Sequence, residues 1–168
     1  MSRTRTYVAG DWTGDENLIA LLYHYNNSSY YKLSFTDAHD LMQANDTSLN
    51  CSIKKSLSQR MDHSKTFILI VGEKTSKLNA GSCFLCRKYS KIYGCMTGQS
   101  VSNKSYIEYE CDKAKRDGLR IVVIYNSTIV QRKKCPEILR YTGEHVPGYY
   151  IGANNTRKFN YSKIFEVL

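Results

Sequence analysis

Two uninterrupted apolar runs constrain the fold of this chain more than any other feature. They cover residues 66–71 (TFILIV) and 121–125 (IVVIY) and consist mainly of β-branched and aliphatic residues. Since neither run alternates with polar residues, both are typical of parallel strands that helices cover on two faces. A charged segment at 105–116 lies between them, and we expect it to form a helix that ends at Gly118.

Strands and helices alternate along the first three quarters of the chain. Besides the two runs, the sequence predicts strands over 5–10 and 30–35, and helices over 16–26 and 49–61. This alternation favours an α/β fold, which we expect to be a single flavodoxin-like domain with a central parallel sheet flanked by helices.

After residue 126 the pattern weakens. We expect a helix at 129–140 that Pro136 interrupts, an edge strand at 146–151 and a terminal helix at 161–168. The single predicted domain, 1–168, comprises a core at about 3–126, an insertion with cysteines at about 76–103, and a less regular extension at 127–168.

The charge balance bears on the partners of the chain. It carries 24 basic and 15 acidic residues, a net charge of +9, which suits a polyanion such as a pyrophosphate-bearing nucleotide. The basic residues are spread out, so we do not expect a nucleic-acid partner. No apolar run approaches the ~20 residues of a membrane helix, and the N-terminus has no hydrophobic leader. We therefore expect no membrane partner and a cytoplasmic location with reduced cysteines.

Two acids near the start of the segment at 105–116 need separate explanations. Ser105 and Glu108 have the spacing of a capping box, which accounts for Glu108. Glu110 points ~200° further around the helix axis and has no capping role. From its position alone, it is either a surface residue, for example one that pairs with Lys113, or a carboxylate in a functional cleft.

Two motifs and their order resemble the TIR domain family. The segment from Ser64 to Thr75 (SKTFILIVGEKT) is similar to the family's apolar strand followed by Gly-x-x-Thr. The segment from Tyr106 to Glu110 (YIEYE), with Ala114 four residues further on, is similar to its aromatic-rich motif that ends in glutamate. The closest resemblance is to the TIR-like proteins of bacterial anti-phage systems of the Thoeris type.

This resemblance implies an enzyme that cleaves the nicotinamide–ribose bond of NAD+. It implies that Glu110 is catalytic and that the product is a cyclic or conjugated ADP-ribose derivative, which signals to a separate effector protein. NAD+ is then a substrate, and self-association with other TIR domains is expected. The implied substrate-binding residues are Gly10, Asp11, Trp12, Phe35, Thr75 and Tyr106.

Two other functions stay open at this point. The first strand lacks the usual TIR pattern, and its residues 7–11 (YVAGD) resemble the start of nucleoside deoxyribosyltransferases, which attack an N-glycosidic bond with a glutamate. Alternatively, the domain is a TIR scaffold without activity that binds other TIR domains. Trp12 is equally compatible with stacking on a base and with ordinary burial.

Three cysteines in the predicted insertion are weak candidates for zinc. Cys83 and Cys86 have a Cys-x-x-Cys spacing, and Cys95 follows. Because no second Cys-x-x-Cys pair completes the set, free thiols are the favoured interpretation and we expect no metal. Among the histidines, only His39 lies near acidic residues in a polar loop, and a solvated turn is favoured there.

Overall fold

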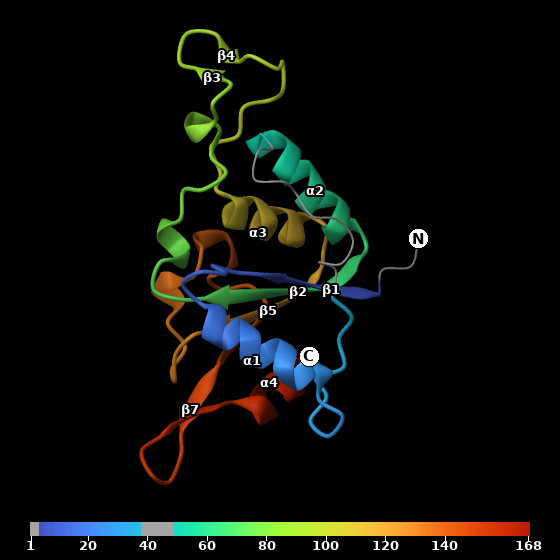
Figure 1. Ribbon diagram of the computed structural model, residues 1–168, viewed down its shortest axis with the longest axis vertical. Coiled ribbons are helices and arrows are strands. Elements are labelled where there is room, and N and C mark those ends of the chain that lie inside the picture. Colours follow the sequence, from blue (N-terminus) through green and yellow to red (C-terminus); the bar gives the residue numbers. More distant parts are fainter. Residues whose placement is uncertain (1–3, 38–48) are drawn as a thin grey trace.

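The central element of the computed structural model is a parallel sheet of four strands (Figure 1). The structure describes residues 4–37 and 49–168. The strand order is β1-β2-β5-β6, and all three pairings are parallel. The strands are β1 (Arg5–Ala9), β2 (Ser64–Val71), β5 (Arg120–Tyr125) and β6 (Glu144–Pro147). This is an α/β fold of the flavodoxin-like kind, as the sequence predicts.

Four helices flank the sheet, with α2 and α3 over one face and α1 and α4 over the other (Figure 1). Their bounds are α1 (Glu16–Asn27), α2 (Asn50–Asp62), α3 (Tyr106–Arg116) and α4 (Tyr161–Val167). These elements agree with the predicted helices to within a residue or two at each end. In the described part of the chain, no helix is both long and apolar enough to cross a membrane.

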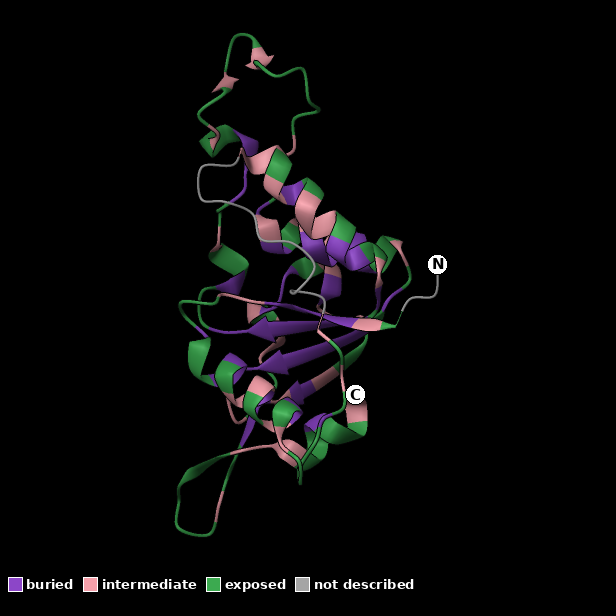
Figure 2. Cartoon of the chain, turned by 45° about the vertical axis from the view of Figure 1, so that its right-hand side comes forward, coloured by how far each residue is buried: buried purple, intermediate pink, exposed green. Residues whose placement is uncertain are grey.

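Each apolar run supplies two cores because successive side chains point to opposite faces of a strand. On β2, Phe67 and Leu69 pack toward α2 and α3, whereas Ile68 and Ile70 pack toward α1 and α4. Figure 2 shows the sheet strands almost entirely buried. This two-sided burial explains why neither run has a polar face.

Local signals determine both ends of α3. The Ser105 hydroxyl accepts a hydrogen bond from the Glu108 amide at 3.2 Å, and the Glu108 carboxylate accepts one from the Ser105 amide at 2.8 Å. The predicted capping box is therefore confirmed. Gly118 follows the helix with a φ of 67°, a conformation that glycine adopts without steric cost.

The prediction of a strand at 30–35 is wrong. The segment has no strand, and a parallel bridge to β1 forms only after it, between Asp37 and Thr6. Two local features replace strand pairing: Ser34 has a φ of 62°, which breaks an extended backbone, and the Asn26 side chain bonds both the amide and the carbonyl of Phe35 at 2.9 Å.

The predicted insertion projects away from the sheet. It contains 3₁₀ turns at Thr75–Lys77 and Cys83–Leu85 and a small hairpin of β3 (Tyr89–Ser90) with β4 (Gly94–Cys95). Figure 1 shows this hairpin at the end of the molecule furthest from a second hairpin, which residues 149–159 form.

The C-terminal region differs from its predicted pattern. The expected helix at 129–140 is replaced by two 3₁₀ turns, Arg132–Lys134 and Glu137–Leu139, on either side of Pro136. The edge strand expected at 146–151 is divided between β6, which pairs with β5, and a separate hairpin. That hairpin consists of β7 (Tyr149–Ile151) and β8 (Arg157–Phe159).

Candidate active site

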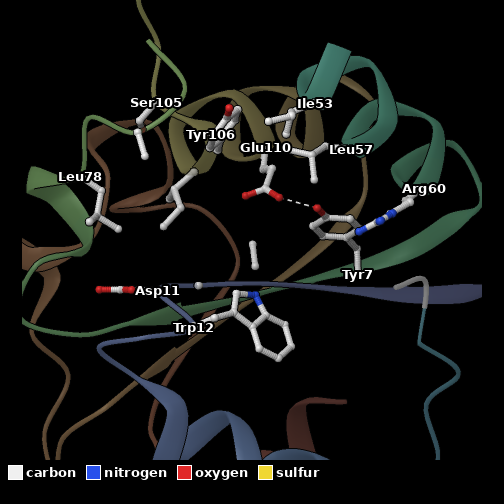
Figure 3. Close-up of a pocket in the computed structure, with 14 residues that line it drawn as sticks. Tyr7, Asp11, Trp12, Ile53, Leu57, Arg60, Leu78, Ser105, Tyr106 and Glu110 are labelled. Carbon is white, nitrogen blue, oxygen red and sulfur yellow. Dashed lines mark hydrogen bonds between the residues drawn. The ribbon is translucent and has the colours of Figure 1, made fainter. Parts of the chain in front are cut away.

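A cleft of about 470 Å³ opens at the carboxyl end of β1 (Figure 3). Its walls come from β1 and the loop that follows, from α2, from residues 78–80 and from the first turns of α3. Ligands of open α/β sheets bind at this edge, beyond the carboxyl ends of the parallel strands. The position of the cleft is therefore that of a functional site in this class of fold.

Glu110 lies in the middle of this cleft with only 6% of its surface exposed. It follows Ile107 by three residues and thus shares the buried face of α3. The Tyr7 hydroxyl donates a hydrogen bond to its carboxylate, which Figure 3 marks with a dashed line. The interpretation of Glu110 as a surface residue that pairs with Lys113 is wrong, because Lys113 pairs with Asp62 and Asp117.

Tyr7 is well suited to be the donor to this carboxylate. Its side chain is fully buried and stacks on Phe67 with ring centroids 5.9 Å apart. Burial, and next the neighbouring Glu110 carboxylate, raise the pKa of Tyr7 well above its usual value. The phenol therefore keeps its proton at neutral pH and stabilises negative charge on Glu110.

A buried arginine lies beside Tyr7. Arg60 is 7% exposed, lines the cleft from α2, and points toward Tyr7 in Figure 3. Among the described residues, its Nε atom has no hydrogen-bond partner. Most buried polar atoms are paired, so an unpaired guanidinium atom at a cleft wall requires an explanation.

The loop after β1 brings three predicted site residues to the cleft: Gly10, Asp11 and Trp12. The Asp11 carboxylate accepts a hydrogen bond from the Thr13 amide at 3.2 Å, which holds the loop in a turn. Trp12 is 47% exposed, and its ring lies 6.0 Å from that of Tyr23. The alternative that Trp12 is an ordinary buried aromatic residue is therefore wrong.

Tyr106 completes the wall at the start of α3. Its hydroxyl donates to the Asn50 side chain at 3.1 Å, and its ring lies against Gly81. Gly81 has a φ of +97°, and a Cβ atom there would be 2.5 Å from the Tyr106 ring. Only glycine allows this close approach without a shift, and the contact helps to hold the ring.

Two predicted substrate-binding residues lie elsewhere. Phe35 lines a different groove, and its ring lies 6.0 Å from that of Tyr23. Thr75 is 3% exposed, and its hydroxyl accepts a hydrogen bond from the Gly72 amide at 2.8 Å. Thr75 therefore stabilises the turn after β2, and neither residue is among those that line the cleft.

Sequence reasoning missed several residues of the cleft. Tyr7 and Arg60 are the polar ones, while Ile53, Leu57 and Leu78 supply apolar walls. A signal for Arg60 was present in the sequence, because it continues the helical spacing of Ile53 and Leu57 and so places an arginine on an apolar face.

The cysteines form no metal site in the described part of the chain. There, no group of three or more histidine, cysteine or acidic side chains is arranged to hold an ion. All six cysteines are free thiols. Cys83 is buried and its sulfur accepts a hydrogen bond from the Ser102 amide at 3.2 Å, while Cys86 and Cys95 are partly exposed. His39 lies outside the described residues.

The fold and the cleft define an α/β domain with a buried carboxylate at the carboxyl edge of its parallel sheet. Comparison with known proteins adds no family: no protein-family model matches the chain, and no curated protein matches its sequence. The residues of the cleft and the motifs within the sequence are therefore what indicate an activity.

Proposed function

We propose that this protein is a TIR-like enzyme that cleaves the nicotinamide–ribose bond of NAD+. One observation carries the proposal: the glutamate of the TIR-like motif, Glu110, is buried in a cleft at the carboxyl edge of the sheet. The cleft also contains an exposed indole, a second carboxylate and an arginine. A dinucleotide with a cationic base and an anionic linker offers a partner for each of these groups.

The chemistry requires few catalytic groups. The bond between the ribose C1′ atom and the nicotinamide nitrogen breaks, and its electron pair neutralises the cationic ring. Because nicotinamide leaves without a proton, no general acid is needed. The ribose acquires positive charge, as in glycoside hydrolysis, and a fixed carboxylate such as Glu110 stabilises it.

The product depends on the group that attacks C1′. Attack by water gives ADP-ribose and a proton, whereas attack by an atom of the same nucleotide or of another molecule gives a cyclic or conjugated derivative. We favour a cyclic or conjugated signal that acts on a separate effector protein in the cytoplasm during anti-phage defence. Self-association with other TIR domains also belongs to this proposal.

A specific contact favours a second candidate, a nucleoside deoxyribosyltransferase. The first-strand segment that resembles those enzymes contributes Tyr7, Ala9, Gly10 and Asp11 to the cleft. Within it, the Tyr7 hydroxyl bonds the carboxylate of Glu110. Such an enzyme would act on free deoxynucleosides and would leave NAD+ intact.

Substrate consumption separates the two candidates. Lysate of phage-infected cells that express the chain is given NAD+ or a mixture of 2′-deoxynucleosides and free bases, and the products are identified by mass spectrometry. We expect nicotinamide and an ADP-ribose derivative from NAD+, and no exchange of bases. Base exchange with intact NAD+ would support the transferase, and inactivity in both assays would favour a TIR scaffold.

A further inference from the structure

We propose that Arg60 forms the pyrophosphate subsite of the cleft and that Asp11 and Trp12 receive the cationic nicotinamide ring. This inference rests on the proposed function and specifies the substrate class and its orientation. It makes the preferred substrate a phosphorylated ribosyl-pyridinium compound, and it makes a free nucleoside a poor one.

Arg60 has an unsatisfied donor, its Nε atom, among the described residues. Arg60 is 7% exposed, and in residues 4–37 and 49–168 no hydrogen-bond partner of this atom is found. Leaving a buried guanidinium donor unpaired costs free energy, which a bound anion recovers. A guanidinium group also matches the geometry of phosphate oxygens, with which it forms two parallel hydrogen bonds.

Apolar side chains surround Arg60 in the cleft. The apolar side chains of Ile53 and Leu57 lie on the same helix and line the same cleft. Because Arg60 is buried among apolar walls, an ionic hydrogen bond formed there is stronger than one at the surface. Arg60 points toward Tyr7 in Figure 3, and the Tyr7 hydroxyl donates to Glu110.

Charged groups are distributed along the cleft in a fixed order. Tyr7 lies within β1, and Asp11 lies in the loop just after the carboxyl end of this strand. Figure 3 shows Arg60 beside Tyr7 on one side of Glu110 and Asp11 on the other. The cleft therefore has a positive end, a central carboxylate and a negative end.

This order of charges matches the order of groups in NAD+. The pyridinium ring is attracted by the Asp11 carboxylate and by the indole of Trp12, which is 47% exposed. The pyrophosphate, which lies beyond the ribose, then reaches Arg60. In this orientation the ribose C1′ atom lies near Glu110, where the proposed chemistry needs it.

The test measures ligand binding in a Glu110→Gln background, in which NAD+ is not consumed. Calorimetry gives the affinities for NAD+, nicotinamide riboside and inorganic pyrophosphate, with and without Arg60→Met. We expect Arg60→Met to weaken NAD+ binding about 10- to 100-fold, the effect of losing hydrogen bonds to a charged group. Nicotinamide riboside, which lacks the pyrophosphate, should bind within about twofold of its original affinity.

Two controls address folding. Lys55→Met changes an exposed residue of the same helix and should leave all three affinities unchanged. If Arg60→Met does not fold, as judged by its melting temperature, competition between pyrophosphate and NAD+ is measured instead on Arg60→Lys and on the wild-type chain. Pyrophosphate should compete with NAD+ in both, more weakly in Arg60→Lys, because lysine keeps the charge and loses the paired geometry.

Each outcome has a distinct meaning. Equal weakening of NAD+ and nicotinamide riboside by Arg60→Met, or no competition by pyrophosphate, would overturn the subsite even if the wild-type chain cleaves NAD+. Conversely, pyrophosphate binding that depends on Arg60 supports the subsite even if NAD+ is not cleaved, and in that case the proposed function fails instead.

Discussion

At the scale of single residues, the central feature is a carboxylate that the fold buries and then partly stabilises. Glu110 is 6% exposed, and the neutral Tyr7 phenol donates to it from the neighbouring strand. Burying a carboxylate costs free energy that hydrogen bonds must offset. A side chain held in this way keeps one orientation toward the cleft, which electrostatic stabilisation of a cationic intermediate requires.

The interaction between Tyr7 and Glu110 should be measurable in a double-mutant cycle. We expect Tyr7→Phe to lower the free energy of unfolding by about 2 kcal/mol, because it removes a hydrogen bond to a charged group. The loss should be smaller by at least about 1 kcal/mol in a Glu110→Gln background. Urea denaturation of the wild type, the two single variants and the double variant gives the coupling free energy between Tyr7 and Glu110.

The control for this cycle is Tyr30→Phe, since Tyr30 is 83% exposed. Its effect on stability should stay within about 0.5 kcal/mol in both backgrounds. Additive effects of Tyr7→Phe and Glu110→Gln would mean that the hydrogen bond makes no net contribution.

Single residues of the cleft were predictable to different degrees. Glu110, Asp11 and Trp12 could be singled out because a motif or a loop after a strand points to them. Tyr7 could not, because a tyrosine within an apolar strand has many ordinary roles. Arg60 continues the apolar face of Ile53 and Leu57, but this spacing alone does not show which neighbours the guanidinium group meets. The packing of α2 against α3, and of both helices over β1, brings Arg60, Glu110 and Tyr7 to one cleft.

At the scale of elements, the beginning of α3 determines where Glu110 lies. The capping box between Ser105 and Glu108 sets the first turn, and Glu110 follows within the next turn. Ser105 is itself 2% exposed and lines the cleft. Any loosening of this turn therefore changes both the stability of the helix and the geometry of the site.

We expect Ser105→Ala to lower the free energy of unfolding by about 1 kcal/mol, because it removes the oxygen that accepts from the Glu108 amide. Urea denaturation measures the change. Glu108→Gln should have a much smaller effect, since glutamine also completes a capping box. If Ser105→Ala unfolds at the same urea concentration as the unaltered chain, the capping box does not stabilise α3.

Elements with strong local signals could be predicted, whereas those that depend on distant contacts could not. Both apolar runs form the predicted central strands, because their uninterrupted apolar composition indicates burial on two faces. The strand expected at 30–35 is absent because the Asn26 side chain takes the hydrogen bonds of Phe35. Nothing in the alternation of that segment shows that Asn26 competes for its backbone.

At the scale of the whole molecule, the insertion is attached to the helical layer through a buried lysine. Lys54 is 5% exposed, and its Nζ atom donates to the carbonyls of Lys104 at 2.6 Å and of Ser102 at 3.3 Å. Burial lowers the pKa of Lys54 from its usual value. These bonds hold residues 102–104, where the chain comes back from the insertion, against α2. The buried thiol of Cys83 lies in the same groove as Lys54.

We expect Lys54→Met to raise the labelling rate of Cys83 by a maleimide about tenfold, because removing hydrogen bonds from a charged donor favours local opening. Mass spectrometry of the labelled chain gives the rate at each cysteine. Cys111, which is fully buried between α3 and the sheet, serves as an internal reference. Equal labelling of Cys83 in Lys54→Met and in the exposed-site variant Lys55→Met would contradict this role.

The whole account depends on the chemical role of Glu110, and NAD+ turnover tests it most directly. The wild-type chain is compared with Glu110→Gln and with Glu108→Gln, a change of the exposed acid two residues away, in lysate of phage-infected cells. Nicotinamide and the nucleotide product are measured by mass spectrometry. We expect wild type and Glu108→Gln to consume NAD+ and Glu110→Gln to lose at least about 100-fold in rate. Undiminished turnover by Glu110→Gln, or no turnover by the wild type, would contradict the account.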